Sequence, residues 1–550
     1  MMEIASLKRL GRAMLGLAGL AAAFALAPAP ASARTDAVPY LEVQQVLSAD
    51  LNGGGDVLTY TAVAAGINAS ASTRRLEARM SYRYERRIAY EDDLVDDDIH
   101  SGVGQARLQL VPDLLSLDAG ALAARSRGDG RGPIFGFTSV DNPNVAEVYS
   151  AYAGPTLSTR VGDLDVGASY RLGYVLVDDH SLAGVPRIPG QPILDRYGSS
   201  VSHSANASVG MAPGRLPVGW TVGAGYIRED VDRLDQTYEG KYVRGDVVLP
   251  VSSTFALTAG VGYEDIQSKQ DDILRDANGV PIVTPGGNLI PDPSKPRLLA
   301  YDQSGLIWDA GVIWRPSRRT ELQARVGRRY GGTTVTGSFR HEINDAYGIS
   351  ASVYDSVSSF GRLLVTDLSG LPVDFEVNRN PLTSGIGGIG GCIFGQDPGT
   401  GTCFDDAFQS INNANFRNRG ASILFSGGRG PWSFGVGAGY SNREYIAPRF
   451  ETGFSFDGVT DESFSLSASA SRALSQTSSV GVDAYATWFD SGIVGSDGSF
   501  STGISGSYYR SLFHERLQGY AAIGLYTTDS GDFDSTNASG VSWKGRSVSP

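Results

Sequence analysis

Alternation of apolar and polar residues is the feature that most limits what this chain can fold into. Between Leu76 and Arg87, most alternate positions carry apolar or tyrosine side chains, and the positions between them carry mainly arginine and glutamate. Successive side chains of a β-strand point to opposite faces, so this pattern predicts a strand with one apolar and one charged face. Comparable stretches recur at 220–226, 255–264, 308–315 and 432–440.

The apolar stripes have a characteristic order, with aromatic residues at their ends and small aliphatic residues between them. This arrangement is typical of the lipid-facing band of a transmembrane β-barrel, which is flanked by aromatic girdles. The connections are of two sizes, with long polar ones at about 87–98, 268–297 and 361–417. We therefore predict an all-β fold, a transmembrane antiparallel up-and-down barrel of roughly 20–22 strands with these segments as outer loops.

A soluble β-sandwich, β-helix or propeller is the alternative fold class. A two-layer core would need larger aliphatic residues on the buried face than these stripes provide, and the opposite face is unusually charged. No fixed repeat of roughly 20–50 residues indicates a solenoid or a propeller. The barrel accounts better for both faces.

The first 33 residues predict a secretory signal peptide. Lys8, Arg9 and Arg12 precede an apolar run over 13–27, and an Ala-Ser-Ala cleavage site follows at 31–33. The run is short for a membrane-anchoring helix, which is the alternative. We expect residues 34–530 to form a barrel in the cell outer membrane, and residues 531–550 to be an atypical polar tail in which the closing strand is altered or missing.

The charge balance bears on partners. The formal net charge is −13, which disfavours a nucleic-acid partner because such partners favour a basic face. An outer-membrane barrel contacts lipid and lipopolysaccharide and is inserted by the barrel assembly machinery, so we expect these partners.

Arginine dominates the basic residues of the predicted strands. Two interpretations are open for the charged faces: a polar lumen lining that contacts an anionic or hydroxyl-rich solute, or cross-strand ion pairs that fill and stiffen the lumen. The candidate lumen-lining residues are Arg75, Glu77, Arg79, Arg83, Glu85, Arg87, Glu321, Arg325 and Arg329.

Cys392 and Cys403 are the only cysteines, and they lie in the longest predicted loop. In an exported protein a disulfide is their expected state, whereas a metal site would need further ligands nearby. The acidic run over 91–98 lacks the spacing of a calcium loop and is interpreted as a solvated surface loop. No spacing predicts a metal site, a cofactor or a catalytic set, so we expect a protein that is not an enzyme.

Several segments carry a family resemblance: 40–69, 74–90, 106–126, 325–339 and 412–427. Together they resemble the outer-membrane β-barrel proteins associated with PEP-CTERM/exosortase systems, which are similar to barrels found with exopolysaccharide gene clusters of Gram-negative bacteria. The resemblance implies a role in exopolysaccharide export or cell-surface assembly, with polysaccharide and periplasmic export components as partners. It supplies no catalytic residues.

The functional expectation is a passive conduit with a polar lumen, narrowed by the long outer loops. A general diffusion porin for small solutes and a structural or adhesin-type surface barrel are the alternatives. An energy-coupled receptor is disfavoured, because the alternation begins soon after Tyr40 and leaves no room for a plug domain ahead of the barrel.

Overall fold

The computed structural model describes residues 34–51, 57–90, 97–127, 145–178, 197–284, 288–377, 379–380, 382, 391–448, 457–492, 498–513, 517–530, 535–540 and 544–548. The expected signal peptide and most of the acidic run lie outside these residues. Within the described chain, no helix is both long and apolar enough to cross a membrane.

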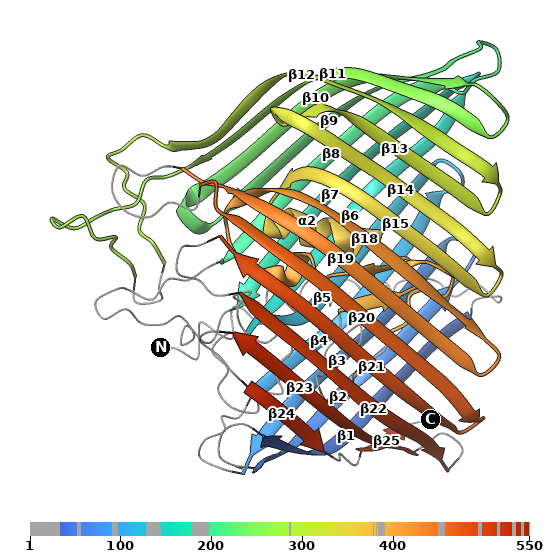
Figure 1. Cartoon of the computed structure of the whole chain (residues 1–550), viewed down its shortest axis with the longest axis vertical. Helices are drawn as coiled ribbons and strands as arrows, with labels where there is room; N and C mark the ends of the chain where they lie inside the picture. Colours follow the sequence, from blue (N-terminus) through green and yellow to red (C-terminus); the bar gives the residue numbers. More distant parts are fainter. Residues whose placement is uncertain are drawn as a thin grey trace.

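Long antiparallel strands make up most of the described chain (Figure 1). Their bounds are β1 (Arg34–Asp50), β2 (Val57–Ser72), β3 (Leu76–Ala89), β4 (Asp97–Val111), β5 (Leu115–Arg127), β6 (Val145–Val161), β7 (Leu164–Asp178), β8 (Ser199–Met211), β9 (Gly219–Val231), β10 (Gln236–Pro250), β11 (Phe255–Gln270), β12 (Leu298–Ser317), β13 (Thr320–Arg329), β14 (Gly332–Asn344), β15 (Tyr347–Ser358), β16 (Cys392–Phe394), β17 (Gly401–Cys403), β18 (Asn415–Arg429), β19 (Trp432–Ile446), β20 (Thr460–Ser475), β21 (Ser478–Ser491), β22 (Ser499–Leu512), β23 (Leu517–Ser530), β24 (Ser535–Gly540) and β25 (Lys544–Val548). The helical elements are η2 (Arg233–Asp235), α2 (Phe360–Gly370) and η3 (Ala407–Gln409).

The strands follow an up-and-down order. Each one from β1 to β15 pairs antiparallel with the next, and β15 then pairs with β18, so the chain between them is left out of the wall. Pairing resumes from β18 to β23. This order confirms the predicted all-β, antiparallel up-and-down class.

The C-terminal residues occupy the space between β23 and β1. The short strands β24 and β25 each pair with β1 on one side and with β23 on the other. Pairing thus returns to β1 through two short pieces that share one strand position. Within the described residues the main sheet has 23 strands, and this sharing reduces them to 22 positions around the wall.

The two faces of the wall separate as the alternation requires. On β11, Leu257, Val261 and Tyr263 are exposed on the outer face, whereas Thr258 and Glu264 on the inner face are buried. On β12, Trp308 and Trp314 bound the exposed stripe. An outer face of this kind suits a barrel in lipid, where every backbone hydrogen bond must be made between strands.

The stretch over 81–90 follows the same rule. Arg83, Glu85 and Arg87 are buried on the inner face of β3. Arg86, which the alternation assigns to the lipid side, donates a 2.7 Å hydrogen bond to Asp98, and Tyr84 donates one of 2.6 Å to the same carboxylate. The outer-face arginine therefore lies near a strand end, where a charge costs far less than at the bilayer midplane.

The two rims of the barrel differ (Figure 1). One carries tight turns, such as those at 162–163 and 318–319, and the other carries the longer connections, including the arm over 271–297. The arm has its own bridges, among them Ile273 with Pro291 and Val283 with Leu289. Short turns are periplasmic and long loops external in outer-membrane barrels, so the short-turn rim is assigned to the periplasm.

Ala259 lies at the centre of the lipid-facing stripe of β11, between Phe255 and Tyr263. We expect Ala259→Arg to lower the free energy of unfolding by about 2–4 kcal/mol, because a guanidinium near the bilayer midplane loses its hydration. Denaturant unfolding from lipid vesicles measures the change, with Ala259→Leu as the control that should remain within about 1 kcal/mol of wild type. Equal stability of the arginine and leucine variants would show that this face does not meet lipid.

Candidate functional site: an internal segment fills the barrel

The chain between β15 and β18 folds inside the barrel. Residues 359–414, called the plug below, contain α2, β16, β17 and η3. In Figure 1, α2 lies within the ring of strands and not above its rim. The sequence predicted a long outer loop over 361–417, but apolar and hydrogen-bonding contacts hold most of this segment against the inner wall.

Helix α2 begins at a capped residue. The Ser359 side chain accepts a hydrogen bond from the Arg362 backbone N–H at 3.2 Å, which satisfies one of the unpaired amides of the first turn. The apolar face of α2 comprises Phe360, Leu364, Val365 and Leu368, all buried.

The wall against which α2 packs is apolar on its inner face. Leu122, Val148, Val175 and Val177 belong to the same buried cluster as the helix. Gly173 gives the helix room, because a Cβ there would lie 2.9 Å from the Val365 side chain. These contacts fix the helix against β5–β8.

A buried ion pair ties the start of the helix to β9. Arg362 lies 3.2 Å from Glu229, and the Ser359 hydroxyl donates to the same carboxylate at 2.5 Å. The Arg362 guanidinium also stacks 3.5 Å from the centre of the Tyr238 ring. Both charged groups are nearly inaccessible to solvent, so removing either would leave the other uncompensated.

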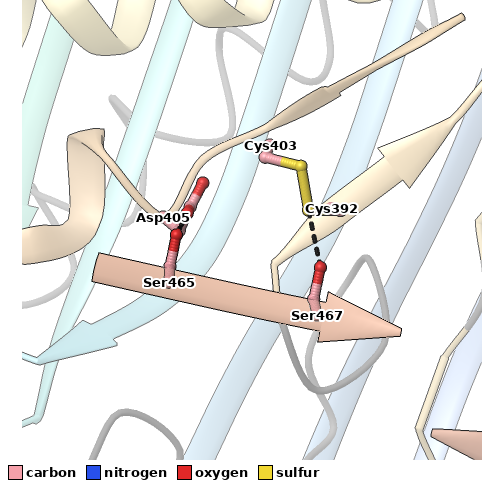
Figure 2. Close-up of a disulfide and its surroundings, with 5 residues drawn as sticks. All are labelled: Cys392, Cys403, Asp405, Ser465 and Ser467. Atoms are coloured by element: carbon pink, nitrogen blue, oxygen red, sulfur yellow. Dashed lines mark hydrogen bonds between the residues drawn. A yellow bond between two sulfur atoms is a disulfide. The ribbon is translucent and has the colours of Figure 1, made fainter. Parts of the chain in front are cut away.

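The hairpin of β16 and β17 meets the wall at β19 and β20. Cys392 and Cys403 are directly paired across the hairpin and are joined by a disulfide. Figure 2 shows the Cys392 sulfur beside the Ser467 hydroxyl, at 3.0 Å, and Asp405 accepting a hydrogen bond from Ser465.

A wall glycine makes room for the disulfide. A Cβ on Gly437 would lie 2.8 Å from both sulfur atoms, so a side chain there would displace the hairpin. Asp405 and the two cysteines lie close enough to share a metal ion. Sulfur engaged in a disulfide is not a thiolate ligand, however. We therefore interpret the two cysteines as a covalent crosslink between β16 and β17.

The remaining part of the plug reaches β3, β4 and β22. Arg79 donates to the Phe375 carbonyl oxygen at 2.7 Å, Arg379 donates to the Ser101 hydroxyl at 2.7 Å, and Asn380 donates to the Ser505 hydroxyl at 2.7 Å. Leu382 packs in a cluster with tyrosines of β21 and β23. Together with the contacts on β5–β9, β19 and β20, these contacts reach strands on opposite sides of the ring, so the plug spans the lumen.

The predicted lumen-lining residues fall into separate groups. Arg83 lies 2.6 Å from Glu42 and also pairs with Glu85, which is 2.8 Å from Arg87. All four side chains are at most 9% exposed. Arg79 contacts the plug, whereas Arg75 and Glu77 are exposed beside the short turn before β3.

The second predicted group lies on β13. Arg325 pairs with Asp246 at 2.8 Å and with Asp309 at 3.2 Å. The remaining pairs are Arg329 with Glu264 and Glu321 with Arg315, each at 2.7 Å. Both groups therefore make cross-strand ion pairs, and a role in contacting solute stays a prediction.

Sequence reasoning missed the plug and the acidic partners on neighbouring strands. The partners Glu42, Asp246 and Asp309 could be assigned only once the strand register was known. A signal for the plug was present in the stretch over 172–177, where Leu172 faces outward and Val175 and Val177 face inward. A strand that is apolar on both faces predicts cover on both sides.

A group of carboxylates lies where the plug meets β18–β20. Asp406 accepts from Asn418 at 2.9 Å and lies 3.2 Å from the fully buried Arg443. In α2, an Asp367 carboxylate oxygen is buried with no hydrogen-bond partner. Burial raises the pKa of Asp367 well above its usual value, and the negative charges of Asp406 and Asp405 raise it further, against the opposing effect of Arg443.

Comparisons with known proteins are limited to structure. No protein-family model and no curated protein matches the chain. The FrpB iron transporter from Neisseria meningitidis (F5-1 variant) has a TM-score of 0.44 at 10% identity, covering 94% of this chain and 83% of its own. The open form of the ferric-catecholate import receptor Fiu from E. coli K12 has a TM-score of 0.46 at 10% identity, with 94% and 82% covered. The copper transporter OprC has a TM-score of 0.40 at 12% identity, with 92% and 80% covered.

The location follows from the wall itself. The antiparallel up-and-down strands and their exposed apolar outer face place the chain in the cell outer membrane, as predicted, where that face meets lipid.

Two predictions are wrong. The resemblance to PEP-CTERM/exosortase-associated barrels is not supported, since no family model matches the chain. Alternating strands with aromatic girdles are common to outer-membrane barrels in general, so they do not distinguish one family from another.

The predicted function as a passive exopolysaccharide conduit is also wrong, as is the porin alternative, because the plug crosses the lumen from β5–β8 to β20 and β22 and obstructs it. The structural or adhesin-type alternative does not account for a segment that fills the lumen, and it is not retained. The sequence argument concerned only a plug domain ahead of the first strand, and it did not consider a segment inserted between two strands.

The two groups of inner-face ion pairs differ in burial, so their loss should differ in cost. Arg83 is 4% exposed and Arg325 is 30% exposed. We expect Arg83→Ala to cost about 3–5 kcal/mol, because it removes the arginine that compensates the buried carboxylate of Glu42 and one of the two arginines beside Glu85. Arg325→Ala should cost about 1 kcal/mol or less. Unfolding in vesicles compares the two variants, and equal losses would contradict the assigned burial.

Asp367 should destabilise the plug at neutral pH. Because its pKa is raised in the folded state, the folded protein holds the proton more tightly, and stability falls as pH rises from about 4 through the raised pKa. Asp367→Asn removes this loss, so α2 should exchange its amide hydrogens more slowly than wild type at pH 7 and about equally at pH 4. The exposed plug residue Asp397 provides the control, Asp397→Asn. Faster exchange in Asp367→Asn at pH 7 would refute the assignment.

Proposed function

We propose that this protein is a gated importer of the outer membrane, in which the plug closes the barrel until a solute is recognised. The observation that carries the proposal is the set of plug contacts on opposite sides of the ring, from the α2 cluster on β5–β8 to the contact of Cys392 with Ser467 on β20. A segment that crosses the lumen obstructs free diffusion, so passage requires the plug to rearrange. The barrel assembly machinery, which inserts such barrels, remains an expected partner.

Both ends of the plug are fixed to the wall. Ser358 at the end of β15 pairs with Phe416 at the start of β18, so the plug enters and leaves the lumen at adjacent strands. A segment held in this way opens by changing its own fold or its contacts inside the barrel. The open arrangement must be favoured by whatever binds it better than the closed one, either the solute or a periplasmic partner.

The ligand class needs a direct test. The neighbours are named for iron, ferric-catecholate and copper, and metal ions and their chelates are therefore the first solutes to assay. The proposal of a gate does not depend on that choice, because it stands on the contacts of the plug.

Replacement of residues 360–413 by a short Gly-Ser linker tests the gate. The linker is sterically feasible because β15 and β18 are paired where the plug leaves them. We expect the wild-type protein to conduct little in planar bilayers and the plugless variant to form a large, stable pore. The matched control shortens the outer arm at 272–296, which should leave the barrel closed. Equal conductance of wild type and the plugless variant would overturn the proposal.

A further inference from the structure

Two arginines at the junction of plug and wall have no carboxylate partner in the described part of the chain. Arg79 of β3 donates to the carbonyl oxygens of Asp374 and Phe375, at 3.3 and 2.7 Å. Arg379 of the plug donates to the hydroxyls of Ser101 and Ser81, at 2.7 and 3.1 Å. Neutral oxygens therefore satisfy both guanidinium groups.

The other inner-face arginines described above are compensated by carboxylates. Arg83 pairs with Glu42 at 2.6 Å, Arg362 with Glu229 at 3.2 Å, and Arg443 with Asp406 at 3.2 Å. The contrast sets Arg79 and Arg379 apart as positive charges that have no ion-pair partner among the described residues.

Arg379 is the more deeply buried of the two. Its Nε is inaccessible to solvent and has no hydrogen-bond partner. Burial lowers the pKa of Arg379 to about 10, with smaller effects from Tyr40, which raises it, Arg83, which lowers it, and Glu85, which raises it. A cation removed from water without a counter-ion is costly. An anion bound beside Arg379 would therefore lower the free energy of the folded protein.

Both arginines lie on or beside the same inner face of β3. Arg79 and Ser81 are two residues apart on the strand, and the Ser81 hydroxyl accepts the hydrogen bond from Arg379. Both positions are close to the short turn before β3, so the pair lies toward the assigned periplasmic end of the lumen. The Gln396 side chain, with its amide oriented to accept, also contacts Arg79 at 3.0 Å.

We propose that Arg79 and Arg379 form a binding site for the anionic group of a solute, a carboxylate or phosphate, on its way through the barrel. A guanidinium presents a planar fork of donors that matches two acceptor oxygens on one anion, and Ser81 and Ser101 supply hydroxyl donors beside it. The role of this site in transport rests on the proposed gate, but the binding itself does not.

Anion binding at this site is coupled to the plug. Arg79 holds the backbone of the plug at Asp374 and Phe375 through Nη1 alone, and an anion that binds end-on, to Nη1 and Nη2, competes with those two hydrogen bonds. A bound anion therefore favours the arrangement in which this part of the plug is released. The apolar cluster around α2 does not include Arg79 or its hydrogen bonds to the plug. We therefore expect α2 to stay in place while the described residues around Phe375 and Arg379 move.

Calorimetric titration of the purified full-length protein with inorganic phosphate tests the site. Ionic strength is held constant with chloride, so that general screening is the same throughout. We expect saturable binding by wild type, and binding weakened by about tenfold or more, equivalent to about 1.4 kcal/mol, in Arg379→Gln and in Arg79→Gln. Arg244→Gln removes an inner-face arginine that already has two carboxylate partners, Asp246 and Asp309, and it should bind phosphate as wild type does.

Two further measurements keep the outcomes distinct. Heat-modifiable mobility on gels verifies that each variant is folded, and Ser101→Ala, which keeps both charges, should weaken binding by a smaller factor. Absence of saturable binding, or an equal loss in Arg244→Gln, would overturn the site. Phosphate binding by wild type, combined with equal conductance of wild type and the plugless variant, would retain the site and reject the gate.

Discussion

Backbone hydrogen bonding in a medium without water is the constraint on which the rest of this structure depends. Unpaired N–H and C=O groups cost several kcal/mol each in hydrocarbon, so a sheet that crosses a membrane must pair every strand with a neighbour on both sides. The pairing of β15 with β18 meets this demand across a long insertion, and β24 and β25 meet it between β23 and β1. The wall is continuous at β15 and β18 because the intervening residues leave it completely, and they are therefore free to fold inside.

The plug changes the electrostatics of the lumen. In a water-filled pore, ion pairs such as those of Arg83 would be exposed and weak. Here Arg83, Glu42 and Glu85 are almost fully buried, and their pairing becomes a condition for folding. On β10–β13, Asp246 and Arg325 retain partial exposure and form ordinary surface-like pairs. The inner face thus contains both buried and partly exposed ion pairs. The amount of water left beside each pair decides how strongly its loss would destabilise the protein.

The plug combines a firmly held part with a weakly held part. Helix α2 is fixed by an apolar cluster with β5–β8, by a capped first turn and by the buried pair of Arg362 with Glu229. Around Phe375 and Arg379, hydrogen bonds to carbonyls and hydroxyls replace apolar packing. Each such bond contributes only about 1 kcal/mol net, whereas each buried aliphatic side chain contributes about 2 kcal/mol. This difference in local stability is what a gate requires, since one part can move while the other remains anchored.

The sequence by itself determined the wall. Period-two alternation, as at Leu76–Arg87, fixes which side chains face lipid, and the aromatic ends of the stripes and the unequal connections fix the class of barrel and its orientation. These signals are local, because they depend on neighbours within a single strand.

Only the tertiary structure decided what lies inside the lumen. Helix α2 is an 11-residue element in a glycine-rich region, too short to be stable or recognisable alone, and it is held by wall residues far away in sequence. The partners of Arg83 and Arg325 likewise depend on strand register, and the open charges of Arg79 and Arg379 emerge only when plug and wall are brought together.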